Sequence, residues 1–270
     1  TFSKNPIINK LMSHSMEVIG GSSFTWKIQH NILHHSYTNV YGLDEDIDDK
    51  PFLRLSPEGE LKKYHRFQHI YASLLYCFAT LSWTMKKDFV QLFHYHRQGI
   101  TKQYGYKPKL ETTKLFVSKA LYLLYTIGLP IILGVTWWAV LVGFVIMHMV
   151  AGLWITIVFQ LAHVVEGPEH HSHPQNGKLE NTWAIHQLKS TANFSTRSSF
   201  MTYILGGLNF QVEHHLFPNI SHVHYKEISK IVRDTTKEFE LPYYEYRWFT
   251  QAIASHLRVL KNLGNGWRLA

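Results

Sequence analysis

The hydrophobic pattern of the chain is dominated by one stretch, from Ala120 to Val165, in which no Asp, Glu, Lys or Arg occurs. A helix needs about 20 residues to cross a bilayer, so this stretch is too long for one span and fits two helices joined by a tight turn. We predict spans over Leu115–Leu133 and Trp137–Leu161, which make 115–163 a transmembrane helical hairpin. A buried hairpin of a soluble protein is the alternative, but soluble core helices rarely lack charge over this length.

Basic residues flank this hairpin on both sides, whereas its turn carries none. By the positive-inside bias, both flanks lie on the cytoplasmic side of the membrane and the turn lies outside. A shorter apolar run, Ile70–Met85, contains several polar residues, and we expect it to lie at the interface or against the helices rather than to cross. The pattern predicts an all-α integral membrane protein in which 1–114 and 166–270 form a cytoplasmic helical cap.

Composition changes this picture mainly through histidine. The chain has 270 residues with 19 histidines, a single cysteine and a formal net charge of +8. One cysteine, Cys77, excludes an intramolecular disulfide and a cysteine-built zinc or iron–sulfur site within this chain. The basic surplus suits the anionic headgroups of membrane lipids. The basic residues do not cluster with a DNA- or RNA-reading motif, which argues against nucleic acid as a partner.

The first histidine cluster is the segment HNILHH at 30–35. On an α-helix, His30 and His34 lie four positions apart and share one face, so they can address one centre. His35 is rotated by about a third of a turn and could address a second, adjacent centre. Surface or hydrogen-bonded core histidines would explain this cluster equally well if it stood alone.

A second cluster, QVEHH at 211–215, makes the metal interpretation stronger. His214 and His215 lie within one helical turn, and Pro218 ends the helix soon afterwards. His163 stands where the second predicted span emerges from the membrane, and an ionisable residue at the end of a span is a candidate functional residue. Two separate pairs beside this third position favour metal ligands over packing residues.

The number and type of ligands indicate which metal is bound. Neutral imidazole is the commonest metal ligand in proteins. Five or six histidines in paired clusters exceed one zinc site, and imidazole also suits iron. Two irons in an imidazole-rich cage can reduce dioxygen and break an unactivated C–H bond, which side chains alone cannot do.

Three motifs together resemble the membrane fatty acid desaturases: HNILHH followed by SYTN (30–39), AH at the end of a span (162–163) and GGLNFQVEHHLFPNISHVHY (206–225). They are most similar to the bacterial linoleoyl-CoA or Δ6-type group, the front-end desaturases, in which the last histidine box begins with Gln, as at Gln211. The resemblance covers nearly the whole chain, so 1–270 is expected to be a desaturase domain.

The resemblance implies an oxygen-dependent enzyme of lipid metabolism that inserts a cis double bond toward the carboxyl end of an acyl chain, at the Δ6 or Δ5 position. It implies two iron ions, O2 as co-substrate and an external electron donor, a ferredoxin or a cytochrome b-type protein. The substrate would be an acyl-CoA or an acyl-lipid. The enzyme would be a multi-pass protein of the bacterial inner membrane, or of the endoplasmic reticulum in a eukaryote, with a cytoplasmic active site. The implied iron ligands are His30, His34, His35, His163, His214 and His215.

Further residues acquire expected roles from the same resemblance. Gln211 would be a ligand or a group hydrogen-bonded to one. His186 lies in a family-like stretch and would contact the metal, a ligand or the substrate. Asn209, Glu213 and Asp46 are candidates for the partners that orient ligating imidazoles.

One part of the family pattern is missing. The family has a further histidine box, of the HD-x-x-H or H-x-x-x-H type, upstream of 30–35, and none is present in this chain. Thr1–Asn5 resembles the residues that follow this box. We therefore expect the chain to begin after it, without the first pair of spans, and to hold a partial metal site or none.

Two other functions are compatible with the histidine motifs. A histidine-box membrane hydroxylase or ketolase would share the site and add oxygen to its product. A metal-binding membrane transporter or sensor would place its histidines along a transmembrane pathway rather than in a cap. The segments Asp44–Asp49 and Glu166–Lys178 are expected to be solvated loops, and a metal role is not expected for His170, His171 and His173.

Overall fold

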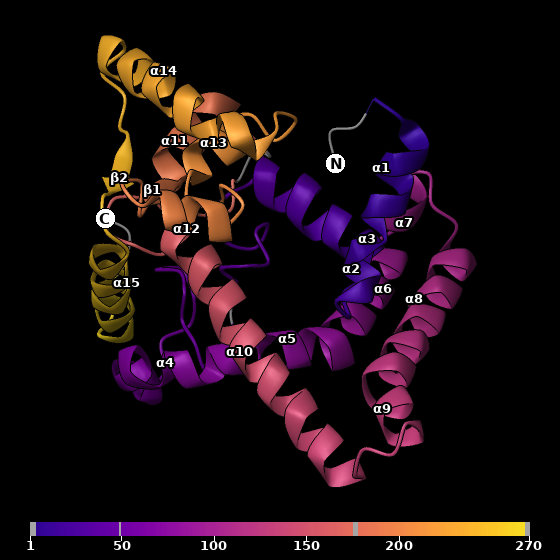
Figure 1. Cartoon of the computed structure of the whole chain (residues 1–270). Helices are drawn as coiled ribbons and strands as arrows, with labels where there is room; N and C mark the ends of the chain where they lie inside the picture. Colours follow the sequence, from indigo (N-terminus) through magenta and orange to yellow (C-terminus); the bar gives the residue numbers. More distant parts are fainter. Residues whose placement is uncertain (1–3, 49, 175–177, 268–270) are drawn as a thin grey trace. The chain divides into compact units, whose positions relative to one another are not determined.

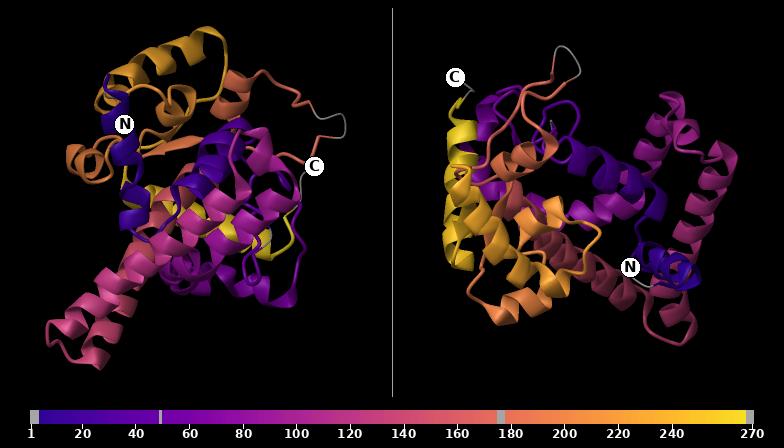
Figure 2. Two further views of the ribbon diagram at one scale, coloured as in Figure 1. Left: turned by 90° about the vertical axis from the view of Figure 1, so that its right-hand side faces the viewer. Right: turned by 90° about the horizontal axis from the view of Figure 1, so that it is seen from above.

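The structure is a computed structural model that describes residues 4–48, 50–174 and 178–267. Helices make up most of the described chain, as the three views in Figure 1 and Figure 2 show. The chain divides into two compact units, one built from 4–28 and 74–155 and the other from 29–73 and 156–267. The predicted helical class is therefore confirmed, apart from one short sheet in the second unit.

The two predicted spans are helices that are long and apolar enough to cross a membrane. The first covers Pro108–Ile132 (25 residues) and the second, α10, covers Trp137–His163 (27 residues). The first begins earlier than predicted because Pro108, with its fixed φ and missing N–H, is well suited to the first helical turn. α10 runs two residues beyond the predicted Leu161, so that His163 is its last residue.

The first of these helices changes its hydrogen-bonding pattern along its length. It consists of α8 (Pro108–Leu123), the π-helical segment η4 (Leu124–Gly128) and α9 (Leu129–Ile132). Pro130 has no N–H to donate, and its ring would clash with the carbonyl group four residues earlier in a regular α-helix. The wider π-helical turn just before Pro130 relieves this conflict and lets the helix continue.

The shorter apolar run 70–85 does not form one long helix. It is divided among α4 (Gln68–Cys77), α5 (Ala79–Ser82) and the π-helical η3 (Trp83–Lys87). Among the described residues it is not one of the helices that could span a membrane, as predicted. The other helices of the first unit are α1 (Pro6–Ser13), α2 (Ser15–Val18), α3 (Ser23–Trp26), α6 (Asp88–Arg97) and α7 (Ile100–Gln103).

A buried ion pair lies among the helices of the first unit. The carboxylate of Asp88 accepts hydrogen bonds from Lys119 Nζ, from Thr25 Oγ1 and from Trp83 Nε1. Lys119 also donates to the carbonyl oxygen of Gly20. The Asp88 side chain is inaccessible to solvent and that of Lys119 nearly so. Because each charge is desolvated, each depends on the other for compensation.

The second unit contains the short sheet and most of the shorter helices. Strand β1 (Ala192–Phe194) runs parallel to β2 (Tyr244–Tyr246), with Asn193 opposite Glu245. The helical elements are η1 (Lys27–His34), which begins in the first unit, η2 (Lys63–Phe67), α11 (Trp183–Ser190), α12 (Ser199–Ile204), α13 (Gln211–Leu216), η5 (His222–His224), α14 (Tyr225–Glu238) and α15 (Phe249–Gly264).

Two apolar clusters hold these elements in place. In the first, Val158 and Leu161 from the end of α10 pack with Phe194 of β1 and with Ala252 of α15. The second joins α11, α13 and α14 through Leu188, Val212 and Val232. The sheet and the ends of α10, α11 and α13 are thus fixed to one another, and these are the segments that carry the histidines and their partners.

We predict that the substitution Asp88→Asn destabilises the protein by about 3–5 kcal/mol, because it leaves the buried ammonium of Lys119 without a counter-charge. Denaturation of the detergent-solubilised protein measures the effect. The double substitution Asp88→Asn with Lys119→Met is expected to recover most of the loss. Glu227→Gln, which breaks an exposed pair with Lys230 on α14, is the control and should change little. Equal stability of Asp88→Asn and the unsubstituted protein would contradict the prediction.

Candidate metal centre

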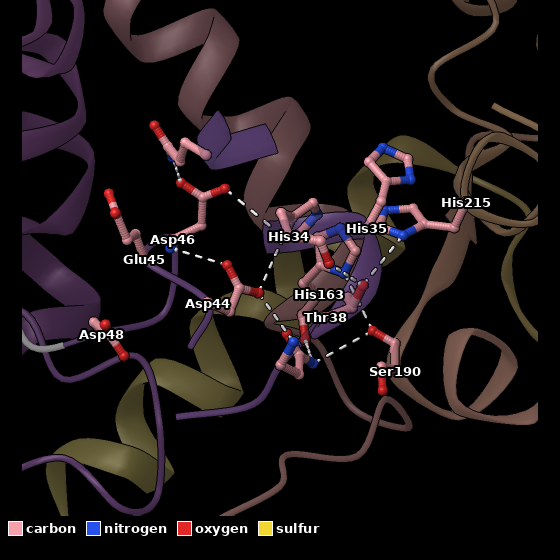
Figure 3. Close-up of polar contacts among 12 residues, drawn as sticks. His34, His35, Thr38, Asp44, Glu45, Asp46, Asp48, His163, Ser190 and His215 are labelled. Atoms are coloured by element: carbon pink, nitrogen blue, oxygen red, sulfur yellow. Dashed lines mark hydrogen bonds and ion pairs between the residues drawn. The ribbon is translucent and has the colours of Figure 1, made fainter. Parts of the chain in front are cut away.

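Three segments of the second unit bring six histidines together. These segments are η1 with the residue that follows it, the last residue of α10, and α13. In Figure 3, the imidazoles labelled His34, His35, His163 and His215 are gathered in one place. The six are His30, His34, His35, His163, His214 and His215, the set implied by the family resemblance.

The six imidazoles form two adjacent groups of three. In each group, the candidate ligand atoms all lie within 4.8 Å of one another. The groups touch, since the rings of His35 and His215 stack with their centroids 4.3 Å apart. This arrangement suits two neighbouring metal ions. One group is His30, His35 and His214, and the other is His34, His163 and His215.

The π-helical form of η1 decides how the first cluster is divided. The α-helical spacing pairs His30 with His34, and these two do lie together with Asp46 in a further group. In the groups of three histidines, however, His30 is paired with His35, and His34 belongs to the other group. A π-helix closes its hydrogen bonds over five residues instead of four, so the π-helical η1 brings side chains five positions apart nearer to one another than an α-helix would.

Hydrogen bonds at Nδ1 orient two of the imidazoles. His34 Nδ1 lies 3.0 Å from Oδ2 of Asp44, and His163 Nδ1 lies 3.1 Å from the carbonyl oxygen of Ser190. A carboxylate and a carbonyl oxygen can only accept, so in both rings Nδ1 carries the proton. The lone pair of Nε2 is then available to a metal, as in most histidine-ligated metal sites.

His215 is oriented in the same way by α11. Its Nδ1 lies 2.8 Å from Oε1 of Gln187. The Gln187 amide nitrogen in turn donates to the carbonyl oxygen of His35 at 3.1 Å, and its Oε1 accepts from Thr38 Oγ1 at 2.8 Å. One glutamine therefore links the two histidine-bearing helices and fixes the orientation of a ring.

The imidazole Nε2 atoms that face the centre are buried. Within the part of the chain that the structure describes, the Nε2 atoms of His34, His163, His214 and His215 have no hydrogen-bond partner. An unpaired buried polar atom costs free energy, and such atoms in native proteins call for a specific explanation such as a bound ion. The donor set therefore fits a metal centre ligated by imidazole nitrogen.

Electrostatics favour the neutral, metal-binding form of His35 and His214. Burial, together with neighbouring imidazoles, lowers the pKa of His35 to about 2 and that of His214 to about 4. Both are neutral at physiological pH, which is the form that binds metals. Burial also lowers the pKa of His34, but the charge and the hydrogen bond of Asp44 outweigh it, so this pKa is raised. Asp44 thus supplies negative charge beside the centre.

The predicted solvation of the acidic run is wrong for its first residue. Asp44 is fully buried, and its Oδ2 also accepts a hydrogen bond from Asn39 N at 2.9 Å, while Oδ1 accepts one from Asp46 N at 3.0 Å (Figure 3). A buried carboxylate is stable only when its acceptors are satisfied, and these donors together with His34 satisfy them. Asp49 lies outside the described residues.

The polar loop after α10 is also more ordered than predicted. His173 is exposed as expected, but His170 is buried, and its ring meets that of Trp267 edge-on at 5.9 Å. The loop is held because His171 N donates to the carbonyl oxygen of Asn39 at 2.9 Å. Among the described residues, neither His170 nor its neighbours in this loop join a group that could hold a metal.

Gln211 and His186 lie on α13 and α11, the helices that carry or orient candidate ligands. Gln211 is buried at the first position of α13, one turn before the histidine pair. His186 is buried on α11, and its Nε2 donates to the carbonyl oxygen of Thr38 at 2.9 Å. It is not a member of the groups of potential ligands found in the described chain. Its hydrogen bond instead holds Thr38, and the hydroxyl group of Thr38 contacts Gln187 and His215.

Glu213 joins α13 to the sheet rather than to an imidazole. Its carboxylate is fully buried and accepts hydrogen bonds from Asn193 Nδ2 and Tyr243 OH, both at 2.8 Å. Asn193 Oδ1 also accepts from Val212 N at 2.8 Å, in the first turn of α13. Burial raises the pKa of Glu213 to about 7. Asn209 likewise binds the backbone around β1, whereas Asp46 lies beside His34.

Three partners of the candidate ligands are not recognisable from the sequence patterns. Asp44, Gln187 and Ser190 lie 10 to 28 positions from the histidines that they bind. No spacing rule connects residues so far apart. The available signal was the SYTN segment at 36–39, because Thr38 and Asn39 within it bind Gln187 and Asp44.

Comparison with known proteins identifies the family. The profile described as fatty acid desaturase matches residues 1–247. An sn-1 linoleoyl-lipid 6-desaturase of Synechocystis sp. is 39% identical over 97% of this chain and 73% of that protein. A protein of the same name from Arthrospira platensis is 34% identical, over 97% of this chain and 70% of the relative. An acyl-lipid (8-3)-desaturase of Physcomitrium patens is 38% identical, over 94% of this chain and 53% of the relative. No solved structure matches at a significant level.

These matches confirm what the histidine motifs predicted. The relatives include enzymes named as 6-desaturases and as Delta(5) desaturases, which agrees with the predicted front-end group. The predicted class, an oxygen-dependent oxidoreductase of lipid metabolism, is confirmed at the level of the family. On the match over 1–247 and the 39% identity across nearly its whole length, the chain belongs to the fatty acid desaturase family.

Proposed function

We propose that the two groups of three histidines bind two iron ions and that this centre inserts a cis double bond toward the carboxyl end of an acyl chain, at the Δ6 or Δ5 position. The observation that carries the proposal is the pair of buried, adjacent three-imidazole groups. The names of the relatives, 6-desaturase and Delta(5) desaturase, support the position of the double bond.

Iron suits this donor set better than zinc. Structural zinc sites use four ligands, commonly with cysteine, and catalytic ones three protein ligands with an open position. Here six imidazoles converge, and the only cysteine of the chain, Cys77, lies in α4, outside the candidate metal-binding groups of the described chain. When bound, two irons would supply the reduction of dioxygen and the removal of two hydrogens from neighbouring methylene groups.

The residues of the chain position this chemistry. Asp44, Ser190 and Gln187 would hold three imidazoles with Nε2 toward the irons. Gln211, at the start of α13, would contact a ligand or an iron, and His186 would act through Thr38. Burial of the ligands would exclude bulk water, which strengthens electrostatic interactions inside the centre and protects it from side reactions.

The substrate is proposed to be an acyl chain carried on a lipid, because the relatives are named as acyl-lipid and linoleoyl-lipid desaturases. An acyl-CoA is the alternative carrier. Electrons would come from a ferredoxin or a cytochrome b-type protein. The two helices that could cross a membrane support a multi-pass membrane protein. The basic flanks of these helices support an active site on the cytoplasmic side, in a bacterial inner membrane or an endoplasmic reticulum.

We predict that His163→Ala in the full-length protein removes most of the bound iron and abolishes product, because it deletes one of three ligands of a group. Elemental analysis measures iron per chain, and mass spectrometry of lipid acyl chains measures the double bond. His173→Ala, an exposed histidine ten residues away, is the control and should keep both. A product that gains oxygen instead of losing two hydrogens would identify a hydroxylase, and full iron content in His163→Ala would contradict the ligand assignment.

A second prediction concerns the partner of His34. Asp44→Asn keeps the size of the side chain but removes its negative charge and one of two acceptor oxygens that are both in use, toward His34 Nδ1 and toward Asp46 N. The orientation of His34 is therefore weakened. We expect about 10- to 100-fold weaker iron retention against a chelator, the usual effect of removing a hydrogen-bond partner of a ligating histidine. Asp48→Asn, in the same loop, should have no effect, because asparagine still accepts from Gly42 N. Equal retention in both variants would show that Asp44 does not support the centre.

A further inference from the structure

Helix α12 presents an apolar face that the folded second unit does not cover. The side chains of Phe200, Tyr203 and Ile204 are 66%, 86% and 46% exposed. They are spaced three and four apart, so they form one stripe on the helix. The opposite face packs inward, since Met201 and Leu205 belong to the apolar cluster of the unit.

The segment of the sequence that contains α12 has few charged residues. Between Thr191 and Val212, the only charged residue is Arg197, which is exposed just before the helix. The exposed apolar residue Ile231 on α14 has different surroundings, because Glu227, Lys230 and Asp234 lie within four positions of it. In space, Glu245 lies beside the segment that contains α12, where it accepts a hydrogen bond from Thr196 Oγ1, but it is paired with Arg233. An exposed apolar stripe with a flanking cation is typical of a helix at a membrane interface.

The position of α12 in the fold also indicates that it lies at the membrane surface. Met201 of α12 packs against the apolar cluster that contains Val158 and Leu161, in the last two turns of α10. Figure 1 shows α12 beside this end of α10. With 27 residues, α10 is about 40 Å long, whereas the hydrocarbon core of a bilayer is about 30 Å thick. If Trp137 and Trp138 lie at one interface, the last turns of α10 reach the headgroup layer at the other.

We propose that α12 is an in-plane anchor that lies in the lipid headgroup layer, with Phe200, Tyr203 and Ile204 directed toward the acyl chains and Arg197 toward lipid phosphates. The occupant of this face is the bilayer itself. Packing against the end of a helix able to span the membrane and the flanking cation Arg197 favour lipid over a protein partner. This inference goes beyond the proposed function and does not depend on metal binding.

The anchor is connected to the helix that carries the last histidine pair. Thr202 of α12 accepts hydrogen bonds from Asn209 Nδ2 at 3.1 Å and, at its carbonyl oxygen, from Gly207 N at 2.9 Å. Gly207 has φ of +76°, and a Cβ there would lie 2.9 Å from that of His222. This tight turn leads into α13 within four residues. Membrane contact at α12 therefore sets the depth of the histidine centre relative to the lipid.

Site-directed spin labelling tests the anchor in the full-length protein, with native cysteines replaced (Cys77→Ala in this chain). Tyr203→Cys or Phe200→Cys carries the label on α12, and Ile231→Cys, 68% exposed in the native protein, is the matched control on α14. All three positions face outward, so the substitutions should not disturb folding. The protein is reconstituted into vesicles of phosphatidylcholine and phosphatidylglycerol, and collisions of each label with oxygen and with a water-soluble nickel chelate are measured.

We expect the α12 labels to collide several-fold more with oxygen, relative to the nickel chelate, than the α14 label does. Oxygen concentrates among the acyl chains and the water-soluble nickel chelate is excluded from them, so this result would support the anchor. Labels at 203 and 200 that are as accessible to the nickel chelate as the label at 231 would overturn it and would leave the face free for a protein partner. Neither outcome depends on iron content or product formation, so failure of the proposed function would not be mistaken for failure of the anchor.

Discussion

The hydrogen bond between His34 and the buried carboxylate of Asp44 is the contact on which the arrangement of the six histidines depends most. It fixes the tautomer of His34, turns its Nε2 toward the other histidines and places a negative charge beside the centre. The same carboxylate accepts from Asn39 N, so the loop after η1 is closed onto the helix. Without this contact, Asp44 would be a buried charge with fewer donors and His34 a ring free to rotate.

Asn39 extends this arrangement to the rest of the second unit. Its side-chain amide donates to the carbonyl oxygens of His163, Glu169 and Ser190, at the end of α10, in the loop that follows and at the end of α11. It does so from a positive φ of 57°, a conformation that asparagine tolerates better than most residues. One residue therefore joins the three segments that supply His163 and its acceptor, because backbone carbonyls buried this deeply need donors.

The centre is rich in imidazole and poor in carboxylate. Neutral rings attract a cation through their lone pairs and contribute no net charge. Among the described residues, Asp44 and Asp46 bring negative charge close to His34. Glu213, a buried acid on α13, is directed to Asn193 and Tyr243, where it fixes the first turn of α13. The two buried acids therefore have different roles. Glu213 fixes α13 to the sheet, whereas Asp44 orients the ring of His34 and raises its pKa.

The sequence by itself determined the fold class, the two long apolar helices, the six histidines and the family. These features are local: length and apolarity define a span, and paired histidines can be recognised at any position. The tertiary structure decided which histidines share a group, because the π-helical turn of η1 sets the register of His30, His34 and His35. It also decided that Asp44 and His170 are buried. Burial and hydrogen bonding join residues far apart in the chain, and no local pattern encodes which distant donor a side chain will meet.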